Sequence, residues 1–499
     1  MFHLFMPLAW EYVSGIAQLL VLLPGAKTEQ QNQQEVIVLP DAIDELGCLR
    51  FRAYAGFVKK LEAFSKHRTY VLKNWQGTLS HVNNHFLLPN LVSVVFDTES
   101  FESYPQYVWM RMILSSKLQE LRVVPNSKVP HRTPSLVIRA LLTDLREKCH
   151  ELRRLALFPS PAIQPHVDEV SQLEGRRLED LKQPWLTNSS LQELSTNLNM
   201  LRTLSQSTSL PALTHLRVWD DSAEEDGCSP MLKQDFPRLR HLGIHNLASH
   251  GTIEDLWQII GPTGQELTYL ELEFLSRFWN SLGWPHGGSP IMAEVISFLV
   301  THGRQIIDLT VHNLPMLLYD IRPVPAESLI QLLLRSSPLE RLCIIGVRVD
   351  NIFDGILRNT FVHLKALELP HQCIGTSVLP HFAKQMPNLE RLSLDLQLEP
   401  FSAPVKNYAK ASALRVLRSN FLEFNSSYYQ FFPKFGRNNY WAAHSLARSA
   451  ECADPQGAID LINSQLKTLL KLNQGSQTEG VDFDSVKILN EEAWCRCFT

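Results

Sequence analysis

Apolar residues recur along the chain in one short pattern, Leu-x-x-Leu-x-apolar, usually preceded by a proline or a polar turn. The pattern is plain in "NLERLSLDLQL", "PRLRHLGIHNL" and "PLERLCIIGVRV". Side chains of a strand alternate between its two faces, so the second and third apolar residues of each copy point the same way. Each copy therefore predicts a short strand with one apolar face. The best copies begin at Leu118, Leu152, Leu213, Leu239, Leu267, Ile306, Leu339, Leu364 and Leu389.

The last four starts, from Leu339 to a degraded copy at Leu414, are 25 residues apart, whereas the earlier unambiguous gaps run from 26 to 39 residues, as if loops were inserted. One such strand cannot bury its apolar face alone, whereas stacked copies form a parallel sheet with a continuous core. Segments 327–337 and 376–386 carry apolar residues at helical spacing and suit the return crossing. Strand and helix together in about 25 residues are the leucine-rich-repeat arrangement. Residues 191–204 fit the pattern ambiguously and are also compatible with a helix.

The predicted fold is therefore an α/β leucine-rich-repeat solenoid, with parallel strands on the concave face, helices on the convex face and helical caps at both ends. Residues 8–25 predict a helix that stops at Pro24 and Gly25, and residues 28–35 predict a polar surface loop. Residues 50–64 predict a helix leading into a strand that closes the first end. The alternative is an ordinary α/β domain with parallel strands, in which the leucine spacing would not need to repeat.

Composition narrows the class of protein. The 499-residue chain has 47 Lys and Arg against 51 Asp and Glu, a net charge of -4, so no basic field favours nucleic acid. Eight scattered cysteines, most of them beside apolar runs, indicate buried thiols in a reducing compartment. The apolar N-terminal stretch has no Lys or Arg before it and contains Glu11, unlike a signal peptide or membrane span. We expect a cytoplasmic or nuclear protein with no membrane and no nucleic-acid partner.

The search for catalytic or metal-binding chemistry finds only weak patterns. No G-x-x-x-x-G-K-[ST], G-x-G-x-x-G or H-E-x-x-H motif occurs. Residues 285–290, "PHGGSP", resemble an oxyanion loop but predict a turn, and the acidic residues 220–227 predict a solvated loop. Cys495 and Cys497 lack a nearby histidine pair for zinc. We expect no enzyme activity, no cofactor and no metal; the alternative is an enzyme with an unrecognised active site.

The polar positions of the pattern predict a second, inner face of the sheet. Adjacent parallel strands lie about 4.8 Å apart, so equivalent positions form columns. One column is predicted to hold His215, His241, Tyr269, Asp308 and Arg341, and the next Trp219, His245, Glu273 and His312. Aromatic, imidazole and charged groups in such a mixture suit recognition of a protein surface; the alternative is that they are simply solvated strand residues. The candidate partner-binding residues are His215, Arg217, Trp219, His241, His245, Tyr269, Glu271, Glu273, Asp308, His312, Arg341, Arg391 and Asp395.

The N-terminal motifs carry a resemblance to a known family. "MPLAW" (6–10), "QLLVLLPG" (18–25), "RFRAYAGFVKKL" (50–61) and "LLPNLVSVVF" (87–96), followed by the repeats, resemble the F-box/leucine-rich-repeat-like proteins abundant in mushroom-forming fungi. The family resemblance implies an F-box that docks on the Skp1-type adaptor of a cullin ubiquitin ligase, while the repeats hold a protein substrate. The F-box would precede Leu8, so we expect it to be largely missing here.

The residue patterns predict an organisation, to which the resemblance adds the F-box remnant and a function. Residues 1–64 would be a remnant of the F-box tail with an N-terminal cap, and 65–420 the irregular solenoid. Residues 421–472 would be a C-terminal helical cap, and 473–499 a polar, partly disordered tail. The implied function is that of a non-enzymatic substrate receptor of an SCF-type ubiquitin ligase, which binds a protein substrate on its concave face. The alternative is a stand-alone scaffold or decoy without a ligase link.

Overall fold

The computed structural model divides the chain into two compact units, with their boundary inside strand β13 (His241–Leu247). The N-terminal unit comprises residues 1–242 and 254–266, and the C-terminal unit comprises residues 243–253 and 267–499. The structure describes residues 2–31, 34–41, 48–63, 70–74, 87–97, 110, 113–124, 133–160, 190–198, 200–201, 210–220, 236–247, 253–254, 256–257, 267–275, 295, 298–299, 305–314, 323–325, 339–345, 348–350, 358–375, 385–397, 416–418 and 421–422.

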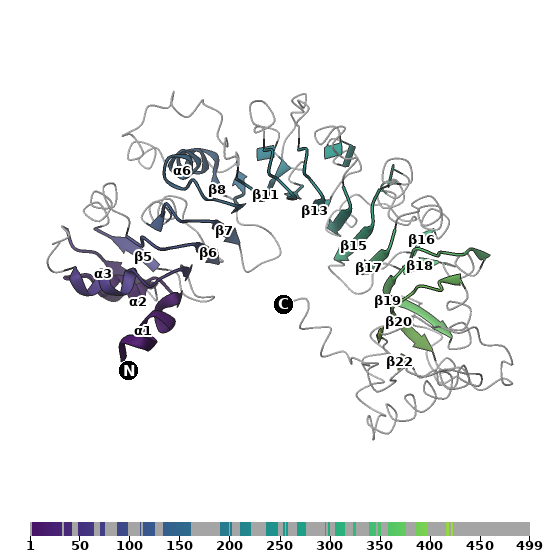
Figure 1. Ribbon diagram of the computed structural model, residues 1–499, viewed down its shortest axis with the longest axis horizontal. Helices are drawn as coiled ribbons and strands as arrows, with labels where there is room; N and C mark the ends of the chain where they lie inside the picture. Colours follow the sequence, from purple (N-terminus) through teal and green to yellow (C-terminus); the bar gives the residue numbers. More distant parts are fainter. Residues whose placement is uncertain are drawn as a thin grey trace, which may run out of the picture. The chain divides into compact units, whose positions relative to one another are not determined.

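The N-terminal unit is built on a parallel sheet with the strand order β1–β4–β6–β7–β9–β11–β12 (Figure 1). These strands are β1 (Tyr12–Ser14), β4 (Lys60–Glu62), β6 (Ser93–Asp97), β7 (Glu120–Val124), β9 (Arg154–Ala156), β11 (Glu193–Asn197) and β12 (His215–Trp219). The described helices are α1 (Phe2–Glu11), α2 (Ala17–Leu20), α3 (Leu49–Ala55) and α6 (Ser135–Lys148). Two small sheets are added, β2 (Lys27–Gln31) with β3 (Gln34–Val38) and β5 (Tyr70–Lys73), and β8 (Thr133–Pro134) with β10 (Pro159–Ser160).

The C-terminal unit repeats the same design, with the strand order β14–β15–β17–β19–β20–β21. Its strands are β14 (Tyr269–Leu275), β15 (Asp308–Leu314), β17 (Arg341–Ile345), β19 (Ala366–Gly375), β20 (Arg391–Gln397), β21 (Val416–Arg418) and β22 (Phe421–Leu422), the last paired with β20. A separate pair joins β16 (Pro323–Pro325) to β18 (Arg348–Asp350). The register of β19 against β20 shifts between Leu369 and Cys373.

The leucines of the repeated pattern form the core of each unit. In the C-terminal unit the second leucines lie side by side in register and are buried: Leu270, Leu309, Leu342, Leu367 and Leu392. The N-terminal unit has the equivalent row Leu121, Leu155, Leu194 and Leu216. The predicted α/β class with repeated parallel strands is therefore confirmed.

A recurring set of backbone hydrogen bonds explains the Leu-x-x-Leu spacing. The amide of the first leucine bonds back three residues, as from Leu213 to Leu210 at 3.1 Å, and this turn leads the chain into the strand. The carbonyl of Gln192 then accepts two amides from the next copy, those of Thr214 at 2.8 Å and His215 at 3.0 Å. The same shared carbonyl recurs in both units, so each copy holds the register of the next.

The N-terminal residues depart from the sequence prediction. The helix expected over residues 8–25 is wrong, because β1 interrupts it and pairs with β4. Gly15 permits the turn into α2 with a φ of 94°, a conformation that residues with a Cβ rarely adopt. The sheet thus begins inside residues 1–64, which the sequence assigned to a cap. Helix α3 does precede a strand, as expected.

Two further segments differ from or refine the expectation. Residues 28–35, expected to be a polar loop, contribute to the antiparallel pair β2–β3, in which Val36 and Ile37, on opposite faces of β3, are both buried. The ambiguous residues from 191 onward contain strand β11. Among the described residues, no helix has both the length and the apolar character needed to cross a membrane.

Other parts of the prediction lie outside the described residues. These include the crossing segment 327–337, most of 376–386, the C-terminal cap beyond residue 422 and the tail 473–499. The described cysteines Cys48, Cys149 and Cys343 are buried free thiols, as predicted for them. Burial raises the pKa of the Cys149 thiol to about 12, which keeps it protonated and unreactive at neutral pH.

Candidate functional site

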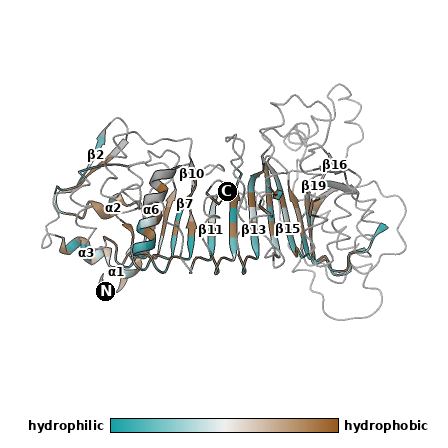
Figure 2. Ribbon diagram, turned by 90° about the horizontal axis from the view of Figure 1, so that it is seen from above, coloured by the Kyte–Doolittle hydropathy of each residue, from teal (hydrophilic) through white to brown (hydrophobic). Residues whose placement is uncertain are grey.

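The candidate site is the face of the sheet opposite the leucine core, called here the polar face. In β12 the side chains of Leu216 and Val218 are buried, whereas Arg217 between them is exposed and His215 and Trp219 are half-buried. Figure 2 shows the same alternation of apolar and polar positions along strands such as β7 and β15. Within each unit the strand period of two therefore places the predicted polar residues on the face opposite the leucines.

Arg341 is the centre of a polar network on the C-terminal unit. Its Nη1 donates to both carboxylate oxygens of Asp308, at 3.1 and 3.2 Å, and to Thr310 Oγ1 at 3.2 Å. Its Nε donates to Glu368 Oε1 at 3.1 Å. Three neighbouring strands, β15, β17 and β19, thus each place one charged group at the same point. Asp308 and Arg341 also register with Tyr269, so the column predicted for this unit is observed.

The surroundings of this network shift its titration. Burial raises the pKa of Asp308, and the charge and hydrogen bonds of Arg341 oppose that rise. Burial alone would lower the pKa of Arg341, but the hydrogen bond and charge of Glu368 outweigh it and raise the pKa. Burial likewise raises the pKa of Tyr269, opposed by a hydrogen bond to Thr310. The network thus places one guanidinium between the carboxyl groups of Asp308 and Glu368.

Two histidines of the C-terminal unit lie against glutamates. His245 Nδ1 is 2.6 Å from Glu273 Oε2, and His312 Nε2 is 4.0 Å from Glu271 Oε1. Glu273 and His312 are also direct register partners, as the sequence predicted. Burial lowers the pKa of His312, while the charges of Glu271 and Glu273 oppose the change. This part of the polar face is therefore acidic when its histidines are neutral.

The predicted histidines of the N-terminal unit form a stacked pair. The rings of His215 and His241 lie 4.0 Å apart with their planes at 9°, and Thr214 Oγ1 lies 2.9 Å from His215 Nδ1. Trp219 packs edge-on against the buried ring of Phe158, with centroids 4.9 Å apart. These contacts hold the side chains of His215 and Trp219, at the two ends of β12, in place before a partner binds.

The same column continues through residues that were missed in the sequence. Arg154 Nε lies 3.1 Å from Glu193 Oε1, and Glu120 accepts a hydrogen bond from Ser93 Oγ at 2.7 Å. The register runs in order through Ser93, Glu120, Arg154, Glu193 and His215. Each of the last four is the residue immediately before the second leucine of its copy. Applying the same rule to the copies that begin at Leu118, Leu152 and Leu191 would have identified Glu120, Arg154 and Glu193.

The remaining candidates lie apart from these clusters. Arg391 is exposed on β20 and registers with Ala366, not with a charged residue. Asp395 registers with Cys373, and its side chain lies outside the described residues. Across the described part of the chain, no group of three or more His, Cys, Asp or Glu is placed to hold a metal ion.

The stacked histidines make stability depend on pH. Burial lowers the pKa of His215 and of His241, and for His241 the charge of His215 lowers it further. A histidine whose pKa is lower in the folded than in the unfolded state contributes stability above its ordinary pKa of about 6.5. This contribution is lost as the pH falls through the pKa of the folded state. His241→Phe keeps an aromatic ring but does not titrate, so unfolding free energy should decline less steeply below about pH 6.5. Urea unfolding between pH 5 and pH 8 measures this slope.

The matched control for that experiment is His363→Phe, because His363 is exposed. This variant should keep the wild-type slope. Equal slopes for His241→Phe and the wild type would contradict the prediction.

Comparison of the chain with protein-family models and with curated proteins finds no match.

Proposed function

We propose that the protein is a non-enzymatic binding protein, a leucine-rich-repeat solenoid whose polar face holds a segment of a partner protein. The observation that supports this most is the Arg341 network, in which four hydrogen bonds from one guanidinium hold groups of three strands. Side chains fixed in advance lose little entropy on binding, which favours recognition by a rigid surface. Aromatic residues and arginine, both present here, supply much of the anchoring energy of protein interfaces.

The finer proposal is that of a substrate receptor in an SCF-type ubiquitin ligase, and it is based on the N-terminal resemblance. Its partners would be a protein substrate on the polar face and a Skp1-type adaptor. The rival proposal is a scaffold or decoy that binds the same partner without a ligase. Purified chain mixed with Skp1 distinguishes the two: a complex on size-exclusion chromatography favours the receptor, and its absence favours the scaffold.

Charge reversal on the polar face tests the binding proposal itself. Arg217 and Arg391 are exposed, one on each unit, so Arg217→Glu and Arg391→Glu should leave the fold intact. At least one of them should weaken partner binding by about tenfold, because a like charge replaces an attractive one in the interface. The partner is first captured by chemical crosslinking in cells and identified by mass spectrometry, and its Kd is then measured with purified proteins.

Arg52→Glu is the matched control, since Arg52 is exposed on α3 and away from the polar face. It carries the same charge change on the same chain. If all three variants bind the captured partner as the wild type does, the polar face is not the binding surface.

A further inference from the structure

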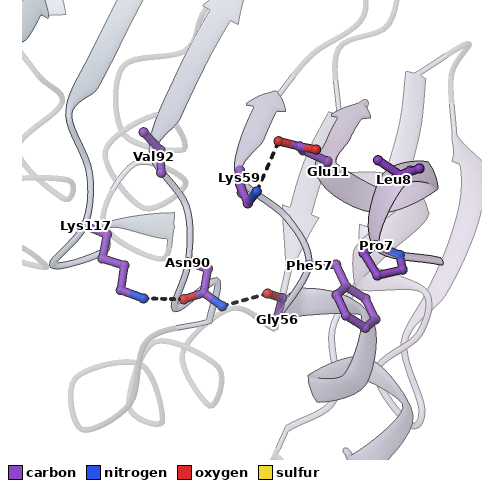
Figure 3. Close-up of a pocket in the computed structure, with 9 residues that line it drawn as sticks. All are labelled: Pro7, Leu8, Glu11, Gly56, Phe57, Lys59, Asn90, Val92 and Lys117. Carbon is purple, nitrogen blue, oxygen red and sulfur yellow. Dashed lines mark hydrogen bonds and ion pairs between the residues drawn. The ribbon is translucent and has the colours of Figure 1, made fainter. Parts of the chain in front are cut away.

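A cavity of about 340 Å³ lies in the N-terminal unit, near the beginnings of strands β4, β6 and β7. It is formed by α1, by the segment that leads from α3 into β4, and by the turns that precede β6 and β7 (Figure 3). A volume of this size is within the usual range for binding sites, which combine apolar walls with a few fixed polar groups. Its lining residues are Pro7, Leu8, Glu11, Gly56, Phe57, Lys59, Asn90, Val92 and Lys117.

One wall of this cavity is apolar. Pro7, Leu8 and Phe57 lie on the same side in Figure 3, and Val92 closes the opposite side. Leu8 is 70% exposed, although a leucine gains free energy when its surface is removed from water. Phe57 and Val92 are only half-buried. An apolar side chain from another molecule would cover all four residues.

Two polar groups of the cavity are held in place by one asparagine. Asn90 Nδ2 donates to the carbonyl oxygen of Gly56 at 2.7 Å, and Asn90 Oδ1 accepts from Lys117 Nζ at 2.7 Å. The two bonds fix the amide and direct the Lys117 ammonium toward the cavity, as drawn in Figure 3. Lys117 is therefore positioned by a neutral group.

The charges in the cavity do not balance. Lys59 Nζ lies 3.2 Å from Glu11 Oε1, so this pair is neutral. Within the part of the chain that the structure describes, Lys117 forms no ion pair with a carboxylate. One positive charge thus remains, on the side of the cavity opposite Pro7, Leu8 and Phe57. A carboxylate is the group that complements it, since it can accept from the ammonium in a charge-assisted hydrogen bond.

We propose that this cavity binds an acidic peptide segment of a partner protein, in which an Asp or Glu lies next to an apolar side chain. The apolar side chain covers Leu8, Phe57 and Val92, and the carboxylate bonds to Lys117. A basic segment is disfavoured, because it would bring a second cation to the uncompensated ammonium. Its lining shares no residue with the polar-face column, so the site adds a second contact to whatever that face holds.

Three blocked pentapeptides test this with the full-length chain, by titration with isothermal calorimetry at low salt. The probes are acetyl-Phe-Glu-Phe-Glu-Gly-amide and the versions with Gln or Lys in place of both Glu. The Glu peptide should bind at least tenfold more tightly than the Gln peptide, and the Lys peptide should bind most weakly. Raising the salt to 0.5 M should reduce this preference, because the ion pair is exposed.

Single substitutions test whether the peptides bind in this cavity. Lys117→Met should weaken the Glu peptide about five- to tenfold, and Leu8→Asn should weaken all the peptides, since it removes apolar surface. Lys73→Met, an exposed lysine outside the cavity, should change nothing. Equal binding of the Glu and Gln peptides, or wild-type binding by Lys117→Met, would overturn the proposal.

A further arm distinguishes a peptide from a free organic acid. The probe 3-phenylpropionate carries the same chemistry without a peptide backbone, and it should bind at least tenfold more weakly than the Glu peptide. Equal or tighter binding of 3-phenylpropionate would overturn the assignment to a peptide. None of these outcomes touches the polar face, which the Arg217→Glu and Arg391→Glu variants test separately.

Discussion

Leu342→Ala is expected to lower the free energy of unfolding by about 2–5 kcal/mol. Leu342 is fully buried in β17, and its register partners on the two neighbouring strands are Leu309 and Leu367. Truncation removes apolar contact on both sides and leaves a cavity that the rigid strand backbones cannot close. Equilibrium unfolding in urea, followed by circular dichroism, measures the loss.

Val362→Ala is the control for this variant. Val362 is 46% exposed and belongs to the turn that precedes Leu364, so its truncation should cost less than about 0.5 kcal/mol. Similar losses for the two variants would show that the leucine row does not form the stabilising core of the C-terminal unit.

Arg341→Met is expected to lower the free energy of unfolding by about 1–3 kcal/mol at pH 7. The change keeps much of the side-chain volume but leaves Asp308 and Glu368 without their shared donor. Because the guanidinium side chain is 31% exposed, we expect less than the loss typical of a fully buried ion pair. The same unfolding experiment measures the effect.

The pH dependence of that variant gives a second readout. Burial already raises the pKa of Asp308, and the charge of Arg341 is what opposes the rise. Without Arg341 the pKa of Asp308 rises further. The difference in unfolding free energy between Arg341→Met and the wild type should therefore shrink as the pH falls through this pKa and Asp308 becomes protonated. Adding Asp308→Asn should restore part of the lost stability at pH 7.

Lys365→Met provides the comparison for a surface pair. Lys365 Nζ lies 2.8 Å from Glu340 Oε2, but both side chains are well exposed to water. Ion pairs in such positions contribute little, so this variant should behave almost as the wild type does. An equal loss from Lys365→Met and Arg341→Met would contradict a special role for the network.

The strand positions and their register could be predicted from the leucine pattern. A slip of one residue would move every leucine to the opposite face, so the buried row permits only one alignment. That is why Tyr269, Asp308 and Arg341 were correctly expected to share a column. The N-terminal strand β1 has only one buried apolar residue, Val13, so its signal was too short to separate it from a helix.

The contacts within the candidate sites were less predictable. Arg341 has carboxylates on both neighbouring strands, and its choice of Asp308 and Glu368 depends on rotamers that spacing does not determine. The cavity brings together Leu8, Gly56, Asn90 and Lys117, which are distant in sequence. No local sequence pattern predicts this cavity, because its formation depends on the positions of the turns between strands.

The shared carbonyls have a consequence for how such a chain changes in length. The amides of Lys365 and Ala366 bond to the carbonyl of Glu340, and those of Glu390 and Arg391 bond to the carbonyl of Lys365. Both acceptors occupy the same place in their copies, 25 residues apart. Excising one period from this stretch would present the following copy with an equivalent acceptor. Genetic duplication or loss of a whole period would therefore preserve the pairing on either side of the join.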